Sequence, residues 1–359
     1  MKGLVLAGGA GTRLRPLTYT GAKQLVPVAN RPVLFYVIDN LVDAGVTDIG
    51  IIISPETGAE IQATLGDGSL FGANFTYIPQ DQPKGLAHAV MIAKPYLGTD
   101  DFVMYLGDNL VGSKIRNAVS DFTLRRDTSA FLMLKEVANP TSFGVAELND
   151  KGELIGLAEK PKVPKSNFAL VGIYMFRSSI FDAIGRITPS PRGELEITDA
   201  ITKLMELGGR VDCARIESWW LDTGKKDDLL LANDTLMDDW LVAANHGAVD
   251  GASKISGRVR IEEGARIERS TIRGPVVIGR NARIVDATIG PFTAIGDEVV
   301  VERSSVQHSV IMTASSIIDI ALVEDSLIGK RVCVRPGAAR RASLSLMVGD
   351  DCVVELSSH

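Results

Sequence analysis

The stretch Leu4-Val-Leu-Ala-Gly-Gly-Ala-Gly-Thr-Arg-Leu-Arg-Pro16 decides the fold of the first part of the chain. Its aliphatic start predicts a buried strand. Its glycines let backbone N–H groups approach phosphate oxygens, and Arg13 supplies a delocalised cation. The loop is not a P-loop, which needs Gly-Lys-Ser/Thr, and Leu14 stands where a dinucleotide-binding fingerprint needs glycine. We therefore predict a phosphate-binding loop of another kind, with an ordinary glycine-rich strand-to-helix turn as the alternative.

The residues after this loop continue the pattern of strands and helices. Residues 31–45 begin with Arg-Pro, carry apolar side chains at helical spacing and end at glycine, and residues 49–53 form an aliphatic run. Residues 102–106 predict a further strand, which ends at Gly107-Asp108-Asn109. This order predicts an α/β fold with a doubly wound, mostly parallel, Rossmann-like sheet, in which ligands bind at the carboxyl ends of strands.

The last third of the chain repeats with a different period. Aliphatic residues recur at spacings of six, six and five, so that steps of 17 residues give the column Ile255, Ile272, Ile289, Val306 and Val323. Steps from Ile261 give a second column, Ile278, Ile295 and Met312. Such hexapeptide repeats predict a left-handed parallel β-helix, with about five coils between residues 255 and 339. We expect two domains, residues 1–245 and residues 246–359.

Composition limits the partners of the chain. Lys plus Arg is 38 against 44 Asp plus Glu, which argues against nucleic acid and against a polybasic membrane patch. No apolar run approaches the roughly 20 residues of a membrane span. The apolar start is too short for a signal peptide, and the three cysteines are odd in number and far apart. We expect a cytoplasmic protein with free thiols that binds small molecules.

Several further motifs follow the glycine-rich loop in a fixed order. They are Lys23-Gln-Leu-Val-Pro27, Pro79-Gln-Asp-Gln-Pro-Lys-Gly-Leu-Ala87, Tyr105-Leu-Gly-Asp-Asn109, Phe143-Gly-Val145, Ala158-Glu-Lys-Pro161, Val171-Gly-Ile-Tyr174, Arg192-Gly-Glu-Leu-Glu-Ile-Thr-Asp199 and Trp220-Leu-Asp-Thr-Gly224. Together they resemble the sugar-nucleotide pyrophosphorylases, and among them the glucose-1-phosphate thymidylyltransferases of the long form, which carry a β-helix. The resemblance implies transfer of a thymidylyl group from dTTP to glucose 1-phosphate, with release of pyrophosphate, by a homo-oligomer.

The resemblance also implies a set of site residues. Arg13, Lys23 and Lys160 would be catalytic, Arg13 and Lys23 holding the triphosphate and Lys160 the sugar phosphate. The nucleotide would be bound by Leu6, Ala7, Gly8, Gly9, Gly11, Thr12, Arg13, Lys23, Gln24, Gln80, Pro83, Gly85 and Asp108. The sugar phosphate would be bound by Asn109, Gly144, Glu159, Lys160, Val171 and Trp220. Asp108 and Asp222 would hold Mg²⁺, which usually takes one or two carboxylates together with substrate phosphates.

Some residues support these roles by their chemistry, and some alternatives stay open. The Gln80 amide can pair with N3–H and O4 of thymine or uracil, so a UTP-dependent uridylyltransferase is one alternative. Phe143 lacks the hydroxyl of the tyrosine that the family often carries there. A non-catalytic regulator that binds sugar nucleotides is a second alternative. We expect His88 to be packed or solvent-facing, and His308 does not stand where an acyl-transfer base of the β-helix would.

Overall fold

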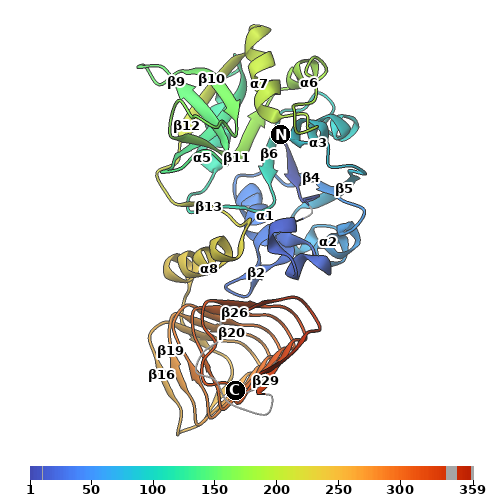
Figure 1. Ribbon diagram of the computed structural model, residues 1–359. Helices are drawn as coiled ribbons and strands as arrows, with labels where there is room; N and C mark the ends of the chain where they lie inside the picture. The colour runs from blue at the N-terminus through green and yellow to red at the C-terminus, as the bar shows by residue number, and fades with distance from the viewer. Residues whose placement is uncertain (10, 337–345, 357–359) are drawn as a thin grey trace. The chain divides into compact units, whose positions relative to one another are not determined.

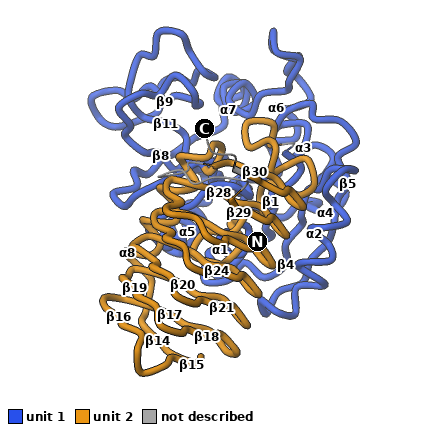
Figure 2. Tube along the Cα trace, turned by 60° about the horizontal axis from the view of Figure 1, so that its bottom comes forward, with its two compact units in different colours: residues 1–10, 34–222 blue, residues 11–33, 223–359 orange. Residues whose placement is uncertain are grey.

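Figure 1 shows the computed structural model, which describes residues 1–9, 11–336 and 346–356. The chain forms two compact units, coloured separately in Figure 2. Unit 1 contains residues 1–10 and 34–222, and unit 2 contains residues 11–33 and 223–359. Residues 11–33 thus group with the C-terminal part. The division into domains at residue 245 stays a prediction.

Unit 1 is built on a nine-stranded sheet with the order β10-β9-β11-β6-β1-β4-β5, in which β8 pairs with β11 and β12 with β8. Strands β6, β1, β4 and β5 are parallel, and β11 runs antiparallel to β6. A separate two-stranded ribbon joins β7 to β13. The bounds are β1 (Lys2–Leu6), β4 (Asp48–Ile53), β5 (Asn74–Pro79), β6 (Phe102–Leu106), β7 (Asn109–Val111), β8 (Thr128–Glu136), β9 (Gly144–Leu148), β10 (Leu154–Glu159), β11 (Phe168–Phe176), β12 (Arg210–Arg215) and β13 (Trp220–Asp222).

Helices alternate with these strands, as the apolar spacing predicts. They are α1 (Val33–Asp43), α2 (Gly58–Leu65), α3 (Leu86–Ile92), α4 (Lys94–Leu97), α5 (Arg116–Leu124), α6 (Ile180–Ile184) and α7 (Ile197–Glu206), with a 3-10 turn η4 (Ser69–Phe71). The core contains fully buried Leu4, Phe102, Met104 and Phe176. The strands predicted for the aliphatic start of the chain, for residues 49–53 and for residues 102–106 are confirmed as β1, β4 and β6. Of the described helices, none is long and apolar enough to span a membrane.

Unit 2 begins with three 3-10 turns and a small hairpin. These are η1 (Thr12–Leu14), η2 (Leu17–Tyr19), η3 (Lys23–Leu25), β2 (Pro27–Val28) and β3 (Arg31–Pro32), and the helix α8 (Lys226–Trp240) belongs to the same unit. The side chain of Asn233 on α8 is fully buried; it accepts a hydrogen bond from Ala29 N at 3.0 Å and donates one to Phe292 O at 2.9 Å. Asn30 Nδ2 donates to Ile295 O at 2.6 Å. The hairpin and α8 are therefore tied to the repeats that follow.

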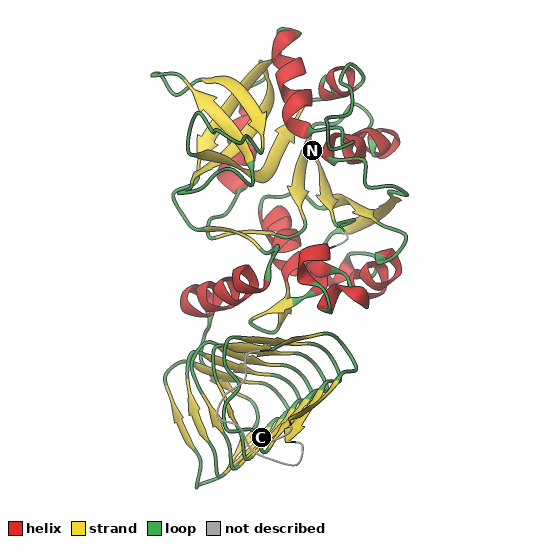
Figure 3. Ribbon diagram, viewed as in Figure 1, coloured by secondary structure: helices red, strands yellow, loops and turns green. Residues whose placement is uncertain are grey.

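The rest of unit 2 is a parallel β-helix, whose three sheets of short strands are visible in Figure 3. One sheet contains β14 (Ala244–Asn245), β17 (Val259–Ile261), β20 (Val276–Ile278), β23 (Thr293–Ile295), β26 (Ser309–Ile311), β28 (Ser326–Ile328) and β30 (Met347–Val348). A second contains β15 (Ala248–Val249), β18 (Arg266–Glu268), β21 (Arg283–Val285), β24 (Val300–Glu302), β27 (Ser316–Ile318), β29 (Cys333–Pro336) and β31 (Val353–Leu356). The third contains β16 (Lys254–Ser256), β19 (Thr271–Arg273), β22 (Thr288–Ile289) and β25 (Ser305–Val306). The predicted left-handed β-helix is confirmed.

The predicted columns agree with the pairing of the strands, with one correction. Ile255, Ile272, Ile289 and Val306 are successive partners, and Val306 forms a bridge with Val323. In the other column the partner of Ile295 is Ile311, so the prediction of Met312 is wrong. Val306 and Ile311 are five residues apart, whereas the equivalent residues of the preceding coil, Ile289 and Ile295, are six apart, and this shifts the residue that faces the core.

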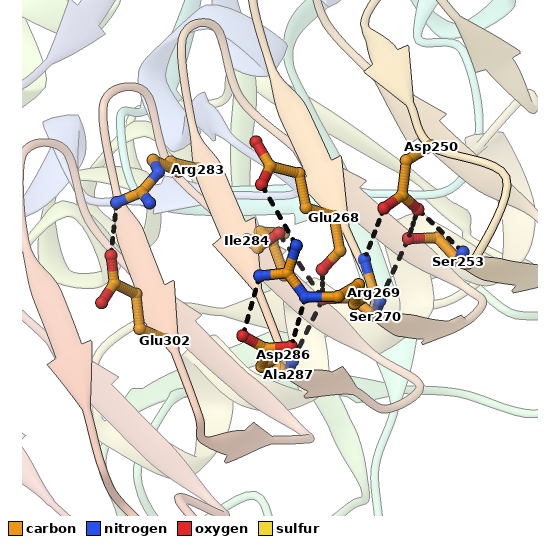
Figure 4. A network of polar contacts seen from close by, with 10 residues as sticks. All are labelled: Asp250, Ser253, Glu268, Arg269, Ser270, Arg283, Ile284, Asp286, Ala287 and Glu302. Carbon is orange, nitrogen blue, oxygen red and sulfur yellow. Dashed lines mark hydrogen bonds and ion pairs between the residues drawn. The ribbon is translucent and has the colours of Figure 1, made fainter.

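Polar side chains stand at the corners of the β-helix and pair between coils (Figure 4). Arg269 donates to both oxygens of Asp286, at 2.7 and 2.9 Å, and its backbone N–H donates to Asp250 at 3.0 Å. Arg303 makes the same two-pronged contact with Asp319. Each of these corner side chains therefore has a partner one coil away.

Candidate functional site

The predicted nucleotide-binding residues of unit 1 gather at the ends of β1 and β5. Leu6 and Ala7 are buried, and Gly8 follows them. A Cβ added at Gly8 would lie 3.5 Å from Gln80 Oε1, so Gln80 is next to this turn. Gln80 N donates to Ile53 O at 2.8 Å, which continues the pairing of β5 with β4. Gly9 and Pro83 are exposed.

Position 85 has no room for a side chain, so only glycine fits there. Its φ is +98°, and an added Cβ would lie 2.5 Å from Leu195 O and 2.8 Å from Leu195 N. Leu195 N in turn donates to Lys84 O, and Ala87 N donates to Leu195 O. The segment before α7 is thereby held against the start of α3, and this close approach needs glycine at position 85.

His88 has a partner that the sequence did not predict. Its Nδ1 lies 3.0 Å from Nε2 of Gln80. Burial lowers the pKa of His88, and the positive charge of Lys84 lowers it further. The ring is therefore neutral at neutral pH.

The two predicted metal-binding acids come to the same end of the β7–β13 ribbon. Asp222 pairs with Asn109 in this antiparallel ribbon, and Asp108 directly precedes Asn109. Asn109 Nδ2 donates to Asp108 Oδ1 at 3.0 Å, and Trp220 Nε1 donates to Asn109 Oδ1 at 2.8 Å. Asp108 is only 8% exposed. A chain of hydrogen bonds therefore orients the Asp108 carboxylate.

This donor set fits Mg²⁺. Carboxylate oxygens are the hard ligands that Mg²⁺ prefers, and the ion keeps waters and substrate phosphates in the rest of its shell. Among the described residues, no group of three or more His, Cys, Asp and Glu side chains could hold a metal ion. The pair of acids suits a metal that arrives with a phosphate-bearing substrate better than one held by the protein alone.

The predicted sugar-binding residues gather at the facing ends of β9 and β10. Glu159 pairs with Gly144 across these strands, and Lys160, with φ +42°, donates its N–H to Phe143 O at 3.0 Å. The ring of Phe143 lies edge-on to Trp220, with 4.8 Å between centroids. Val171 is fully buried on the neighbouring β11. This end of the sheet therefore reaches Trp220, which bonds to Asn109.

The Glu159 carboxylate lies close to two positively charged side chains. Its Oε1 is 3.6 Å from Lys160 Nζ and 3.7 Å from Arg192 Nη2. Burial raises the pKa of Glu159; Lys160 and Arg192 oppose this rise, and Glu196 adds to it. A half-buried carboxylate beside two cations is suited to accept hydrogen bonds from sugar hydroxyls.

Arg192 is a site residue to which the sequence analysis assigned no role. It donates to both oxygens of buried Glu196, at 2.9 and 3.0 Å, which points its guanidinium toward Glu159. The signal was present, because Arg192 opens one of the motifs shared with the family. The local sequence did not show that this motif lies beside Glu159.

Lys135 on β8 is a second residue that the sequence analysis missed. Its Nζ donates to three successive carbonyls: Ile216 O at 3.2 Å, Glu217 O at 3.0 Å and Ser218 O at 2.7 Å. This single ammonium group fixes the segment that leads into β13 and thus to Asp222. A lone lysine in a strand carries no sequence signal for such a role.

The predicted triphosphate-binding residues lie in unit 2. Gly11 has φ +59°, and Thr18 Oγ1 donates to its carbonyl at 2.7 Å, which folds the loop that contains Thr12 and Arg13. The Arg13 guanidinium packs on Gly224, where an added Cβ would lie 2.5 Å from Nη2. Both Thr12 and Arg13 are exposed.

Lys23 and Gln24 share the turn η3. Lys23 is half-buried, and an added Cβ at Gly11 would lie 2.9 Å from Lys23 Cβ. Gln24 is only 1% exposed, and its Oε1 has no hydrogen-bond partner among the described residues. A buried acceptor without a donor is costly, so this oxygen is suited to a donor that arrives with a ligand.

Comparisons with known proteins identify the family of the chain. Residues 2–239 match the model of the nucleotidyl transferase family. The chain belongs to this family. A glucose-1-phosphate thymidylyltransferase of Streptomyces griseus is 47% identical over 358 residues, which is 100% of both chains. The low-salt glycan biosynthesis nucleotidyltransferase Agl11 of Haloferax volcanii is 46% identical over 332 residues, 92% of each chain.

A solved structure matches about two thirds of the chain. It is the structure of a Bacillus anthracis protein assigned as a glucose-1-phosphate thymidylyltransferase. The TM-score is 0.61 at 39% identity, and the match covers 65% of this chain and 94% of that one. The match to Streptomyces griseus, by contrast, includes the length of the β-helix. The chain is therefore similar to members of the family that carry the additional repeats.

Proposed function

We propose that the protein is a glucose-1-phosphate thymidylyltransferase that makes dTDP-glucose and pyrophosphate from dTTP and glucose 1-phosphate. The observation that carries the proposal is the match to the Streptomyces griseus thymidylyltransferase over the whole length of both chains. The arrangement of unit 1 supports it. The residues expected to bind metal and sugar stand at strand ends that meet around Asp108 and Trp220. Strand β1, which leads to the glycine-rich turn beside Gln80, pairs with β6, which leads to Asp108.

The reaction is an in-line attack of the sugar phosphate on the α-phosphorus of dTTP. Two polyanions must approach each other, so positioning and charge neutralisation provide most of the catalysis and no side-chain nucleophile is needed. Arg13 and Lys23 would hold the triphosphate. Lys160 and Arg192, both close to Glu159, would hold the phosphate of the sugar.

The sugar ring would bind above Gly144. Glu159 accepts hydrogen bonds from its hydroxyls, and the side chains of Phe143 and Trp220 form an apolar wall. A Cβ at Gly144 would lie 3.2 Å from Glu159 Oε2, so glycine leaves this carboxylate accessible. Asn109 links the wall to Asp108 through its two hydrogen bonds.

Mg²⁺ would be held by Asp108 and Asp222 and would neutralise charge on the triphosphate. The protein's own part is to keep the two carboxylates oriented. Asn109 does so for Asp108, and the ammonium group of Lys135 does so for the segment before Asp222.

The experiment is a turnover panel of dTTP, UTP, dCTP, ATP and GTP against several sugar 1-phosphates with Mg²⁺, with pyrophosphate release as the readout. We expect the highest kcat/KM with dTTP and glucose 1-phosphate, and appreciable use of UTP, because one methyl group discriminates by only about 1–3 kcal/mol. A preference for UTP would favour a uridylyltransferase instead. Binding of sugar nucleotide without any turnover would favour a non-catalytic regulator.

A further inference from the structure

Residues 11–33, orange in Figure 2, carry the expected triphosphate-binding residues Arg13 and Lys23 but have little regular structure of their own. They form the 3-10 turns η1, η2 and η3 and the hairpin of β2 and β3, whose strands have two residues each. Such a turn is closed by few backbone hydrogen bonds, as Leu14 N closes η1 by donating to Gly11 O at 2.9 Å. Elements this short are marginally stable by themselves, so the shape of the segment depends on its attachments.

The first attachment is at the tip of the hairpin. Both residues of its loop, Ala29 and Asn30, have positive φ, +48° and +61°, a conformation that a non-glycine residue keeps only where its surroundings hold it. Asn30 Nδ2 donates to Ile295 O on β23 at 2.6 Å. A backbone carbonyl can only accept, so the orientation of this amide is fixed. Ala29 N donates to Asn233 Oδ1 on α8 at 3.0 Å, which adds a second bond at the same tip.

The second attachment joins turn η2 to the corner of the β-helix after β30. Thr20, directly after η2, donates its hydroxyl to Asp350 Oδ2 at 3.0 Å. The other carboxylate oxygen of Asp350 accepts from Lys330 N at 2.8 Å, which fixes this side chain on its coil. A Cβ added at Gly349 would lie 3.1 Å from Pro16 O, so the two backbones are in close contact here as well. The segment is therefore held by the β-helix at two separate places.

The expected triphosphate-binding residues are linked to these attachments. Lys23 lies between Thr20 and Asn30 in the sequence, on turn η3. A Cβ added at Gly11 would lie 2.9 Å from Lys23 Cβ, so this turn packs against the loop that leads to Arg13. A displacement of the segment therefore moves both cations.

We propose that Asn30 and Thr20 are positioning residues through which the β-helix holds the triphosphate-binding segment, so that the repeats set the affinity for dTTP. The inference rests on the proposed function, in which Arg13 and Lys23 contact the triphosphate. When a binding segment populates several conformations, its apparent affinity falls in proportion to the fraction that can bind. The two attachments raise this fraction by holding the backbone of the segment rather than the nucleotide. The β-helix thus contributes to substrate binding from outside the site.

The test measures kcat, the KM for dTTP and the KM for glucose 1-phosphate, with saturating Mg²⁺ and second substrate. Asn30→Gly removes the amide without adding charge and suits the positive φ, and Ile295 O keeps its bond from Gly279 N. The KM for dTTP should rise about fivefold, the factor of one lost hydrogen bond. The KM for glucose 1-phosphate should not change, because its expected binding residues belong to unit 1. A variant that is only less stable would lose kcat through its unfolded fraction and keep both KM values.

A second variant tests the other attachment. Thr20→Val removes the hydroxyl at nearly constant volume, and the KM for dTTP should rise about two- to threefold, less than in Asn30→Gly because this bond is exposed. The two factors should multiply in the double variant, since the attachments are separate. Asn281→Gly, at an exposed corner of the β-helix with φ +55°, and Thr235→Val, whose hydroxyl donates to Leu231 O of its own helix, are the matched controls. Both controls should keep all three constants.

Inorganic pyrophosphate separates the phosphates from the rest of the nucleotide. Its Kd, measured by calorimetry with Mg²⁺, should rise in Asn30→Gly by the same factor as the KM for dTTP, because pyrophosphate carries no base or sugar.

An unchanged KM for dTTP in a folded Asn30→Gly protein would overturn the inference, as would an equal rise in Asn281→Gly or an unchanged Kd for pyrophosphate. If Asn30→Gly does not fold, Thr20→Val decides by the same criteria, with Thr235→Val as its control. A wild type that binds pyrophosphate but turns over neither dTTP nor UTP would refute the proposed function itself.

Discussion

The sheet of unit 1 and the β-helix of unit 2 both place residues in the left-handed backbone region, with different results. In unit 1, Lys160 at φ +42° and Gly172 at φ +79° stand beside predicted sugar-binding positions. In the β-helix, Arg269, Asp286 and Arg303 take similar conformations at successive corners. The same local backbone thus serves a candidate site in one region and a repeated turn in the other.

The difference lies in where the partners of polar side chains come from. In the β-helix, charged corner side chains such as Arg269 and Asp286 pair with a residue one coil away (Figure 4), because the repeat presents equivalent positions side by side. In unit 1, Glu159 lies beside Arg192 from a separate motif, and Asn109, which donates to Asp108, accepts from Trp220 of another motif. A regular repeat satisfies its own charges, whereas irregular strand ends bring together different chemical groups that a substrate can use.

The largest expected effect contrasts an acid from each region. Asp108→Asn or Asp222→Asn keeps the volume but removes a negative ligand, so turnover should fall about 100-fold or more while the melting temperature changes little. Steady-state kinetics with saturating Mg²⁺ measures this. Asp286→Asn, at a corner of the β-helix, is the control and should keep full turnover. Full activity of both site variants would refute the assignment of a metal to this pair.

The next effect concerns the tie between α8 and the repeats. Asn233→Ala would leave Ala29 N–H and Phe292 O without their partner, and two part-buried groups that lose a hydrogen bond cost about 1–3 kcal/mol of unfolding free energy. Urea unfolding should show this loss. Leu231→Ala, on the same helix but 52% exposed, should cost far less. Equal losses of unfolding free energy in the two variants would mean that the hydrogen bonds of Asn233 contribute no more to stability than an exposed leucine side chain.

A smaller effect tests the close packing at the sugar-binding end. In Gly144→Ala the new Cβ would lie 2.8 Å from Leu170 Cδ1 and 3.0 Å from Thr198 Cγ2, so neighbours of Glu159 must move. We expect the KM for glucose 1-phosphate to rise about tenfold, equivalent to about 1.4 kcal/mol. Gly251→Ala meets no atom within 4 Å and should leave this KM unchanged. An unchanged KM in both would remove Gly144 from the sugar site.

The smallest effect is a pH dependence of stability in unit 2. His308 Nε2 lies 2.8 Å from Asp234 Oδ2, and Nδ1 contacts Asp325, whose carbonyl accepts from Lys226. Burial opposes protonation of His308, but the bonds and charges of Asp325 and Asp234 outweigh it and raise the pKa above its usual 6.5. Asp238 also acts on Asp234, whose own pKa is raised mainly by burial.

A raised pKa means that this contribution to stability is complete below pH 6.5 and is lost as the pH rises through the pKa of the folded state. The melting temperature of the wild type should therefore decrease over that range relative to His308→Asn. The difference should be about 2 °C or less, because the pair is partly exposed. If the melting temperatures of the two proteins change by the same amount between pH 6 and pH 9, a stabilising charge on His308 is excluded.

The sequence alone predicted those features that are encoded over short distances. Continuous aliphatic runs, helical spacing and the period of 17 residues predicted the strands, the helix α1 and the stacked columns, because each pattern decides which side chains can be buried together. The turn that shortens one coil was missed, so Ile311 rather than Met312 continues its column. The sequence also predicts that the aliphatic segment 343–348 covers the end of the β-helix. Residues 343–345 lie outside the described residues, and Met347–Val348 pairs with β28.

The tertiary structure decided which distant residues act together. The sequence provided Asp108 and Asp222, but the β7–β13 ribbon brings them to one end. The bonds of Gln80 with His88, of Arg192 beside Glu159 and of Lys135 to three carbonyls follow from the packing of strands and helices. A single hydrogen bond between remote residues leaves no periodic trace in a sequence, because its geometry depends on every element between them. The repeating core of the β-helix can therefore be predicted from the sequence, whereas the pairing of side chains at the candidate site can be seen only in the tertiary structure.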